Sequence, residues 1–342
     1  MVRSTSLHLA ALLGVAAFAT AQPSFDWRLR RGFPAPVTPA DNPMTAEKVE
    51  LGRHLFYDTR LSGNGQQSCG SFHRQELAFT DGLARAKGSR GEIHPWSSMS
   101  LVNVAYAAAL TRSDPNAVEL ESQALTPMFG AQPVELGLQG QEERVLRDLR
   151  GPTVYQRLFP AAFPGDAQPF RVGNVAKALA AFQRTIISTR SSCNRYRYEG
   201  DEGALFAAAM RGEKLFFPGE KAGCFQGHGG WNFGGAVRYA GGPPVKPDSH
   251  ITGLGSHTAK AEDVGKFRAP TLRNIAITAP YMHDGSIATL EAVIGHYFVG
   301  GRSGLQPHRS PILRPLQFAV AEKQELIEFA GATPGSGLGA AD

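Results

Sequence analysis

The chain has 342 residues, of which 42% are hydrophobic and 19% are charged, and its formal net charge is +5. These proportions exclude a disordered chain and describe a globular protein long enough for two domains, each with its own core. The small basic excess is not gathered on one segment, so we predict no nucleic-acid partner.

The first residues have the features of an export signal. Arg3 precedes an apolar run from Leu7 to Phe18, and Ala19-Thr20-Ala21 offers small residues for cleavage. The run is too short to cross a bilayer comfortably, and no later segment reaches its length without charges. We therefore predict a signal peptide over residues 1–21, a mature chain without a membrane span, and a periplasmic location.

Helical patterns fill the chain between two irregular ends. Residues 22–43 are rich in proline and predict an extended arm, while residues 332–342 are rich in Gly and Ala and predict a flexible tail. Apolar residues recur at helical spacing over 174–188 and over 290–298, where Thr289 is placed as an N-cap. Alternating strand patterns are scarce, so we expect an all-α protein with long loops.

One stretch of the chain is echoed later in the same order. Residues 52–57, Gly-Arg-His-Leu-Phe-Tyr, precede a Cys and a His four positions apart at residues 69–73. Residues 212–217, Gly-Glu-Lys-Leu-Phe-Phe, precede another such pair at residues 224–228. The repetition predicts a duplicated domain, with one copy over residues 44–200 and the other over residues 201–331.

A Cys followed four residues later by a His can attach and ligate a haem. The thiol adds to a haem vinyl group and the histidine ligates the iron, and the usual signal is C-x-x-C-H. Here the two motifs read C-G-S-F-H and C-F-Q-G-H, so Phe72 and Gly227 stand where a second cysteine is expected. Each match alone is weak, and taken alone it would be better explained by an ordinary core cysteine near a surface histidine.

The flanking motifs are more specific. The chain resembles bacterial di-haem cytochrome c peroxidases over roughly residues 42–330, at residues 51–65, 78–82, 229–233, 267–274 and 279–286. This resemblance implies an all-α fold of two cytochrome c-like helical domains with long loops. It also implies one c-type haem in each domain, the first peroxidatic and the second engaged in electron transfer.

For the first haem, the resemblance implies attachment at Cys69 and axial ligation by His73. By the same likeness, the distal pocket would hold three residues, namely Gln123, Pro127 and Glu135. A carboxylate in that position can move a proton between the two oxygens of hydrogen peroxide and assist cleavage of the O–O bond. Without the flanking motifs, Glu135 would be read as a solvated loop carboxylate.

For the second haem, the resemblance implies attachment at Cys224 and axial ligation by His228, with Tyr297 as the opposite ligand. Peroxidases of the family use a methionine there. Tyrosine is typical of the branch that contains the methylamine dehydrogenase maturation enzyme and methanobactin-cluster di-haem enzymes, which oxidise protein side chains. A tyrosinate stabilises higher iron oxidation states. The spacing of Tyr297 also fits an aromatic packed on an apolar helix face.

A calcium site between the domains is a further implication of the resemblance. Its ligands would be the Asn103 side chain and the backbone carbonyls of Thr278 and Pro280. Oxygen ligands suit this hard cation, but three neutral oxygens are a weak signal by themselves.

Three interpretations of function stay open. The first is a periplasmic oxidoreductase that uses hydrogen peroxide to oxidise a side chain of a protein substrate, with each haem held by a single thioether. The second is a hydrogen peroxide-reducing enzyme fed by a small electron-donor protein. The third is a degenerate, haem-poor binding or structural protein, because both second cysteines are missing. The family's usual inter-haem tryptophan is also absent near residues 111–115, and Trp96 could replace it only by another route.

Overall fold

The computed structural model describes residues 25–217, 221–235, 237–242, 252–301 and 309–333. The described chain is mostly helical, and its one sheet pairs two short antiparallel strands, β1 (Arg238–Tyr239) and β2 (Phe267–Arg268). The expected all-α fold class is confirmed. The helices are α1 (Ala46–Tyr57), α2 (Cys69–Phe72), α3 (Leu120–Phe129), α4 (Glu142–Arg150), α5 (Thr153–Ala162), α6 (Val172–Arg184), α7 (Ser192–Tyr198), α8 (Ala207–Phe216), α9 (Gly255–Thr258), α10 (Leu290–Phe298) and α11 (Val320–Gly331).

Helices α1 and α6 form the centre of the first half. Thr45 caps α1 by accepting a hydrogen bond from the backbone N–H of Lys48. The helices cross at Gly52, where a Cβ atom would stand only 1.9 Å from the carbonyl oxygen of Ala178. One turn on, the rings of Phe56 and Phe182 meet with their centroids 5.1 Å apart. A glycine is therefore required for the close approach that lets these two rings pack.

Helices α8 and α11 repeat this arrangement in the second half. A Cβ atom at Gly212 would stand 1.9 Å from the carbonyl oxygen of Glu325. The rings of Phe216 and Phe329 then meet at 5.3 Å. The two copies of the sequence echo thus form equivalent helix pairs, and each has a partner helix that the echo did not reveal. The exact domain bounds remain a prediction.

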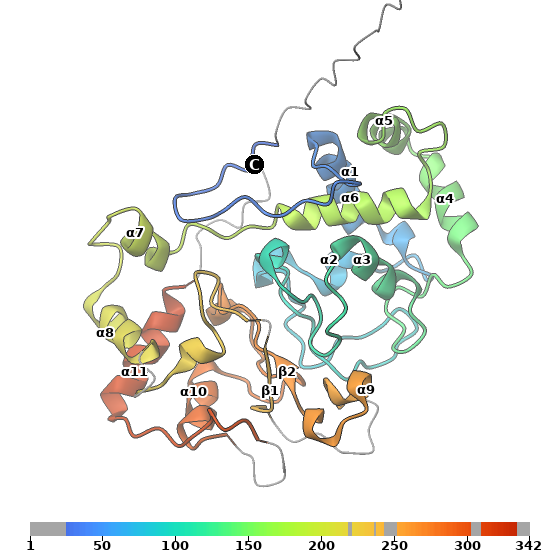
Figure 1. Ribbon diagram of the computed structural model, residues 1–342. Coiled ribbons are helices and arrows are strands. Elements are labelled where there is room, and N and C mark those ends of the chain that lie inside the picture. The colour runs from blue at the N-terminus through green and yellow to red at the C-terminus, as the bar shows by residue number, and fades with distance from the viewer. Residues whose placement is uncertain (1–24, 218–220, 236, 243–251, 302–308, 334–342) are drawn as a thin grey trace, which may run out of the picture.

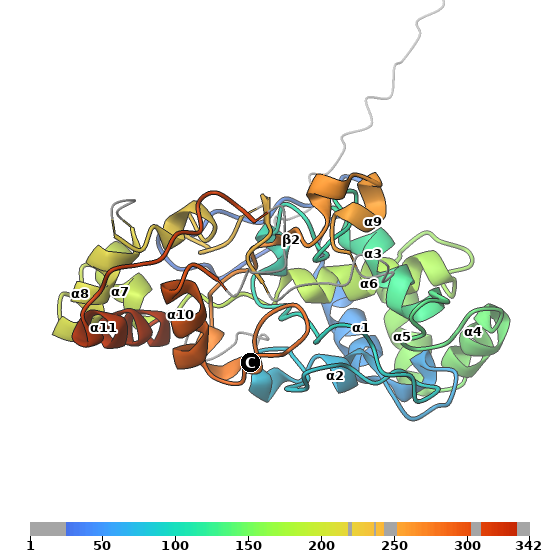
Figure 2. The same cartoon turned by 90° about the horizontal axis from the view of Figure 1, so that it is seen from below.

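The two helix groups stand on opposite sides of the molecule. Figures 1 and 2 show α1, α4, α5 and α6 on one side and α8, α10 and α11 on the other, with the small sheet between them. The helix expected over residues 174–188 begins at Val172 and ends at Arg184, because the Thr185 hydroxyl donates back to the Phe182 carbonyl and Ile187 no longer bonds within the helix. The expected helix over 290–298 and its Thr289 cap are confirmed.

The described part of the N-terminal arm runs without helix or strand to Pro43. It is anchored where Phe33 packs against Trp231, with ring centroids 5.0 Å apart, and where Tyr106 donates a hydrogen bond to the carbonyl of Pro34. The predicted signal peptide and most of the predicted tail lie outside the described residues. Among the helices that are described, none is long and apolar enough to cross a membrane.

Candidate haem sites

His73 is held in a fixed orientation at the end of α2. Its backbone N–H donates to the carbonyl of Cys69 at 2.9 Å, which makes one helical turn of the motif. Its Nδ1 lies 2.9 Å from the carbonyl oxygen of Phe79, and a carbonyl can only accept, so this nitrogen carries the proton. Burial lowers the pKa of His73. The ring is therefore neutral, with the lone pair of Nε2 left to bind a metal.

His228 is held in the same way. Its backbone N–H donates to the carbonyl of Cys224 at 2.9 Å, and its Nδ1 lies 3.0 Å from the carbonyl oxygen of Pro270. Burial lowers its pKa as well. A backbone carbonyl on Nδ1 is the usual support of a metal-binding histidine, because it fixes both the tautomer and the ring direction. Both histidines thus fit the role of haem ligand.

The two attachment cysteines each begin a single turn, which is α2 for Cys69 and the 3₁₀ turn Cys224–Gln226 for Cys224. Neither forms a disulfide with another cysteine. Burial and the neighbouring carboxyl of Glu135 raise the pKa of Cys69 to about 12, and burial raises that of Cys224 to about 11. Both therefore stay protonated at neutral pH and are poor nucleophiles by themselves.

Tyr297 and His228 line one cavity of 350 Å³. Cys224 and Gly227 line it beside the histidine, while Val293 and Ile294 line it along α10 beside the tyrosine. Burial and the nearby Cys224 raise the pKa of Tyr297 to about 12. The phenol is therefore protonated until a cation faces its oxygen and lowers that pKa. The predicted ligand pair is brought together around one largely apolar space.

Glu135 lies near Cys69 in the first site. Burial raises the pKa of Glu135, while His94 opposes the shift, so this carboxyl holds its proton more readily than an exposed one. Pro127 accepts a hydrogen bond from the backbone N–H of Leu136 at 2.8 Å, which fixes the Glu135 loop on α3. Gln123 lies one turn earlier on α3. No contact among these described residues joins Gln123 to His73 or Glu135.

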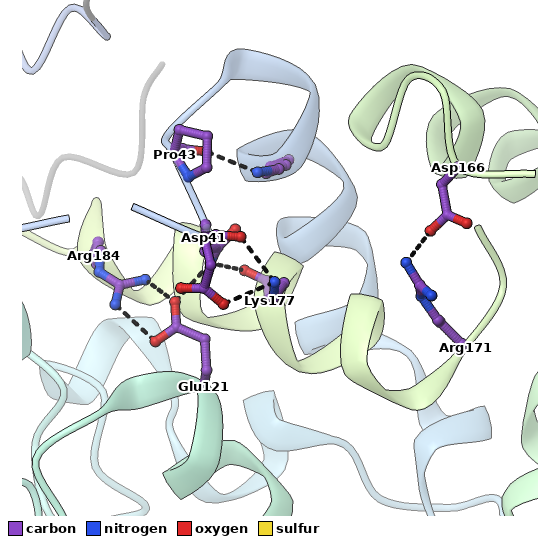
Figure 3. A network of polar contacts seen from close by, with 9 residues as sticks. Asp41, Pro43, Glu121, Asp166, Arg171, Lys177 and Arg184 are labelled. Carbon is purple, nitrogen blue, oxygen red and sulfur yellow. Dashed lines mark hydrogen bonds and ion pairs between the residues drawn. The ribbon is translucent and has the colours of Figure 1, made fainter. Parts of the chain in front are cut away.

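A partly buried polar network holds α3 against α6 (Figure 3). Arg184 on α6 donates to both carboxylate oxygens of Glu121 on α3, at 2.7 and 2.8 Å. Asn42 donates to the same carboxylate at 2.6 Å, and Lys177 pairs with Asp41 at 3.0 Å. Burial opposes ionisation, but these donors still keep the pKa of Glu121 below its ordinary value. The network fixes the helix that carries Gln123 and Pro127.

The two positions that lack a cysteine differ in their surroundings. Phe72 is 6% exposed and belongs to the core of the first half. Gly227 lines the cavity, and a Cβ atom there would meet nothing closer than a Tyr239 ring carbon at 3.6 Å, an ordinary contact. A thiol would therefore fit at Gly227, whereas at Phe72 it would replace a packed ring.

The three predicted calcium ligands, Asn103, Thr278 and Pro280, all line the same cavity as Tyr297. The Asn103 side-chain oxygen already accepts a hydrogen bond from the backbone N–H of Ser188 at 2.7 Å. A second lone pair on that oxygen remains for a cation. The calcium site stays a prediction.

Three further side chains in the cavity wall were given no role by the sequence: Arg112, Arg268 and His283. His283 stacks on Phe267 at 4.2 Å, and Trp96 meets His283 edge-on at 5.8 Å. Trp96 thus contacts His283, a residue of the cavity wall. It does not occupy the position where family members carry the inter-haem tryptophan. Arg268 and His283 belong to the long motifs at residues 267–274 and 279–286, which could have drawn attention to them.

Comparisons with known proteins identify the family of the chain. A family profile described as "Di-haem cytochrome c peroxidase" matches residues 46–203. Cytochrome-c peroxidase IdrP1 of Denitromonas iodatirespirans is 36% identical over 328 residues, covering 86% of this chain and 83% of that protein. Methylamine utilization protein MauG of Methylorubrum extorquens is 34% identical over 305 residues, covering 85% of this chain and 79% of that protein.

A solved structure supports the same family and fold. The crystal structure of a MauG-like protein associated with microbial copper homeostasis superposes with a TM-score of 0.86 at 38% identity, covering 93% of this chain and 97% of that one. Membership of such a family implies two haem cofactors and a peroxidase-type oxidoreductase. The chain belongs to the di-haem cytochrome c peroxidase family, in its MauG-like branch.

Proposed function

We propose that this protein is a periplasmic di-haem oxidoreductase that uses hydrogen peroxide to oxidise a side chain of another protein. The observation that carries this proposal is the pairing of Tyr297 and His228 across one cavity. An anionic oxygen ligand lowers the reduction potential of haem iron and favours its higher oxidation states. Such a site suits storage of oxidising equivalents more than acceptance of electrons from a small donor.

The residues of the first site support the peroxide half of the proposal. A haem bound by His73 would supply the redox chemistry. Glu135, whose pKa burial raises, can hold a proton at its carboxyl oxygen and pass it between the two oxygens of peroxide. The α3 network keeps the loop that bears Glu135 in place.

A hydrogen peroxide-reducing enzyme fed by a small electron donor is the second candidate. It is favoured by the relatives named as cytochrome c peroxidases, among them IdrP1 and the cytochrome c551 peroxidase of Nitrosomonas europaea, which is 31% identical over 264 residues. The third candidate, a haem-poor protein, is favoured by the phenyl ring that occupies the second cysteine position of the first motif.

Single thioether attachment, calcium binding and export belong to the same proposal. Cys69 and Cys224 each keep the first attachment position, so a single thioether at each site would still tether the porphyrin beside its histidine. The cavity oxygens of Asn103, Thr278 and Pro280 supply hard donors of the kind that Ca²⁺ prefers. Mass analysis of denatured protein and cell fractionation test the attachment and the location.

The decisive variant is Tyr297→Phe. We expect it to change the absorption spectrum of the second haem and raise its reduction potential, while the His73 haem is left intact. Tyr239→Phe is the matched control, because this tyrosine lines the same cavity but donates its hydroxyl to the carbonyl of Gln226 at 2.7 Å. An unchanged spectrum in Tyr297→Phe would reduce Tyr297 to a packing role.

Rapid mixing with peroxide separates the first two candidates. An oxidase of protein side chains should accumulate a long-lived oxidised species when no donor is present. A donor-fed peroxidase should instead turn over rapidly once a reduced cytochrome or cupredoxin is added. Rapid turnover with such a donor and no persistent species would favour the second candidate.

A further inference from the structure

The wall of the cavity that holds His228 and Tyr297 brings two arginines together. Arg268 lies on β2, and its backbone N–H donates to the carbonyl of Arg112 at 2.9 Å. Both side chains line the cavity that also holds His228 and Tyr297. In the antiparallel pairing of β1 with β2, Arg268 stands directly opposite Arg238. Opposed residues share one face of a sheet, so the positive charge of Arg238 lies beside that of Arg268, in addition to Arg112.

No carboxylate forms an ion pair with Arg112 or Arg268 in the part of the chain that the structure describes. Arg112 donates to the carbonyl and hydroxyl oxygens of Ser97, both at 2.8 Å. Arg268 donates from Nε to the carbonyl of Thr111 at 3.3 Å, and its two terminal nitrogens have no acceptor among the described residues. The guanidinium end of Arg268 is thus free to bind a ligand in the cavity.

The positive charges of Arg112 and Arg268 are not fully balanced by nearby carboxylates. Burial, together with Arg268 as a like charge, lowers the pKa of Arg112 to about 10, although Asp81 and Asp284 oppose the shift. Burial and the facing Arg238 lower the pKa of Arg268 to about 10. Both groups still carry their charge at neutral pH. A partly buried charge without an opposite partner is costly, so an anion in the cavity would stabilise this wall.

Haem brings such an anion with it, because its porphyrin carries two propionate carboxylates. We propose that Arg268, with Arg112 beside it, binds a propionate of the haem that His228 would ligate, and so orients the porphyrin in the cavity together with the thioether at Cys224. The assignment rests on the proposed haem-dependent function. Arg268 suits the task because a guanidinium offers two parallel N–H donors that match the two oxygens of a carboxylate.

A test compares haemin with haemin dimethyl ester, in which both propionates are capped as neutral esters. The full mature chain is purified without haem in a His73→Ala background, so that His228 is the axial histidine under study. Each porphyrin is titrated in while absorbance reports binding. We expect haemin to bind about 10- to 100-fold more tightly than the ester, the usual effect of a charge-assisted hydrogen bond pair.

Arg268→Gln should lower this affinity ratio by about tenfold, mainly by weakening haemin, since charge-assisted bonds are about twice as strong as neutral ones. Glutamine keeps an N–H group that can serve Thr111. Arg268→Lys keeps the positive charge but lacks the two parallel N–H donors of the guanidinium, so it should give an intermediate affinity ratio. Lys214→Gln is the matched control, because it removes the same charge from the exposed side of α8 and should leave the ratio unchanged.

The outcomes distinguish this assignment from the function on which it rests. Equal binding of haemin and the ester by the parent chain overturns the role of the arginines and leaves haem binding intact. A ratio that Arg268→Gln and Arg268→Lys both leave unchanged does the same. If the parent chain binds neither porphyrin, the haem-dependent function fails and the assignment fails with it. Should Arg268→Gln not fold, the ratio for Arg268→Lys decides.

Discussion

The crossing of α8 with α11 can be tested by one added methyl group. In Gly212→Ala the new Cβ would stand 1.9 Å from the Glu325 carbonyl oxygen and 2.8 Å from the Phe329 Cβ, whereas such contacts are not seen below 3.0 Å. The helices must therefore separate by about 1 Å. Overpacking of this kind costs about 3 kcal/mol, and the better helix propensity of alanine returns about 1 kcal/mol.

The net loss of about 2 kcal/mol should lower the unfolding midpoint by roughly 4 to 8 °C. It should also loosen the second haem site, because Phe216 and Leu326 of this helix pair line the cavity. Gly173→Ala is the control, since that exposed glycine in α6 has nothing within 4 Å of an added Cβ. It should gain about 0.5 to 1 kcal/mol. Thermal unfolding followed by circular dichroism measures both, and equal midpoints for the two variants would refute the close crossing.

Three other predictions concern the first half and the attachment sites. Arg184→Met should cost about 3 kcal/mol, because the partly buried Glu121 loses its cation and keeps only the hydrogen bond from Asn42, and wild-type unfolding by denaturant at two pH values should show the matching acid sensitivity. Because the folded pKa of Glu121 is lowered, its contribution is present above the unfolded pKa and is lost as pH falls through the folded pKa, so a pH-independent stability below pH 5 would contradict it. Glu135→Gln should slow the reaction with peroxide by about 100-fold or more in stopped-flow mixing, and an unchanged rate would remove its proton role. Gly227→Cys should raise haem loading with little change in stability, whereas Phe72→Cys should cost about 3 kcal/mol of core packing; equal stabilities would contradict the difference between the two sites.

Local patterns predicted the parts of this fold that depend on neighbours in the chain. The apolar spacing and the Thr289 cap predicted α10, and the repeated Gly-x-x-Leu-Phe motif predicted that α1 and α8 are equivalent. The partners of these helices could not be read from spacing, because α6 and α11 share with each other little beyond a short Leu-x-x-Phe pattern, at Leu179–Phe182 and Leu326–Phe329. The pairing becomes visible only when the chain is folded.

The candidate sites divide in the same way. The Cys–His spacing predicted His73 and His228, and the structure adds the carbonyls of Phe79 and Pro270 that orient them. The approach of Glu135 to Cys69 spans residues far apart in the chain, so only family resemblance could suggest it. The motif at residues 267–274 could have drawn attention to Arg268, but a sequence does not show whether the charge of an arginine is paired in the fold.

The most direct test of the central claim is the alkaline pyridine haemochrome spectrum of the protein produced in a periplasm. We predict two haems per chain, each with one unsaturated vinyl group, so the absorption band should be red-shifted from that of doubly linked haem. Denatured protein should retain the haem mass, since Cys69 and Cys224 each supply one thioether. A colourless native chain that turns red only when Phe72→Cys and Gly227→Cys are introduced would contradict the account and leave a haem-poor protein in its place.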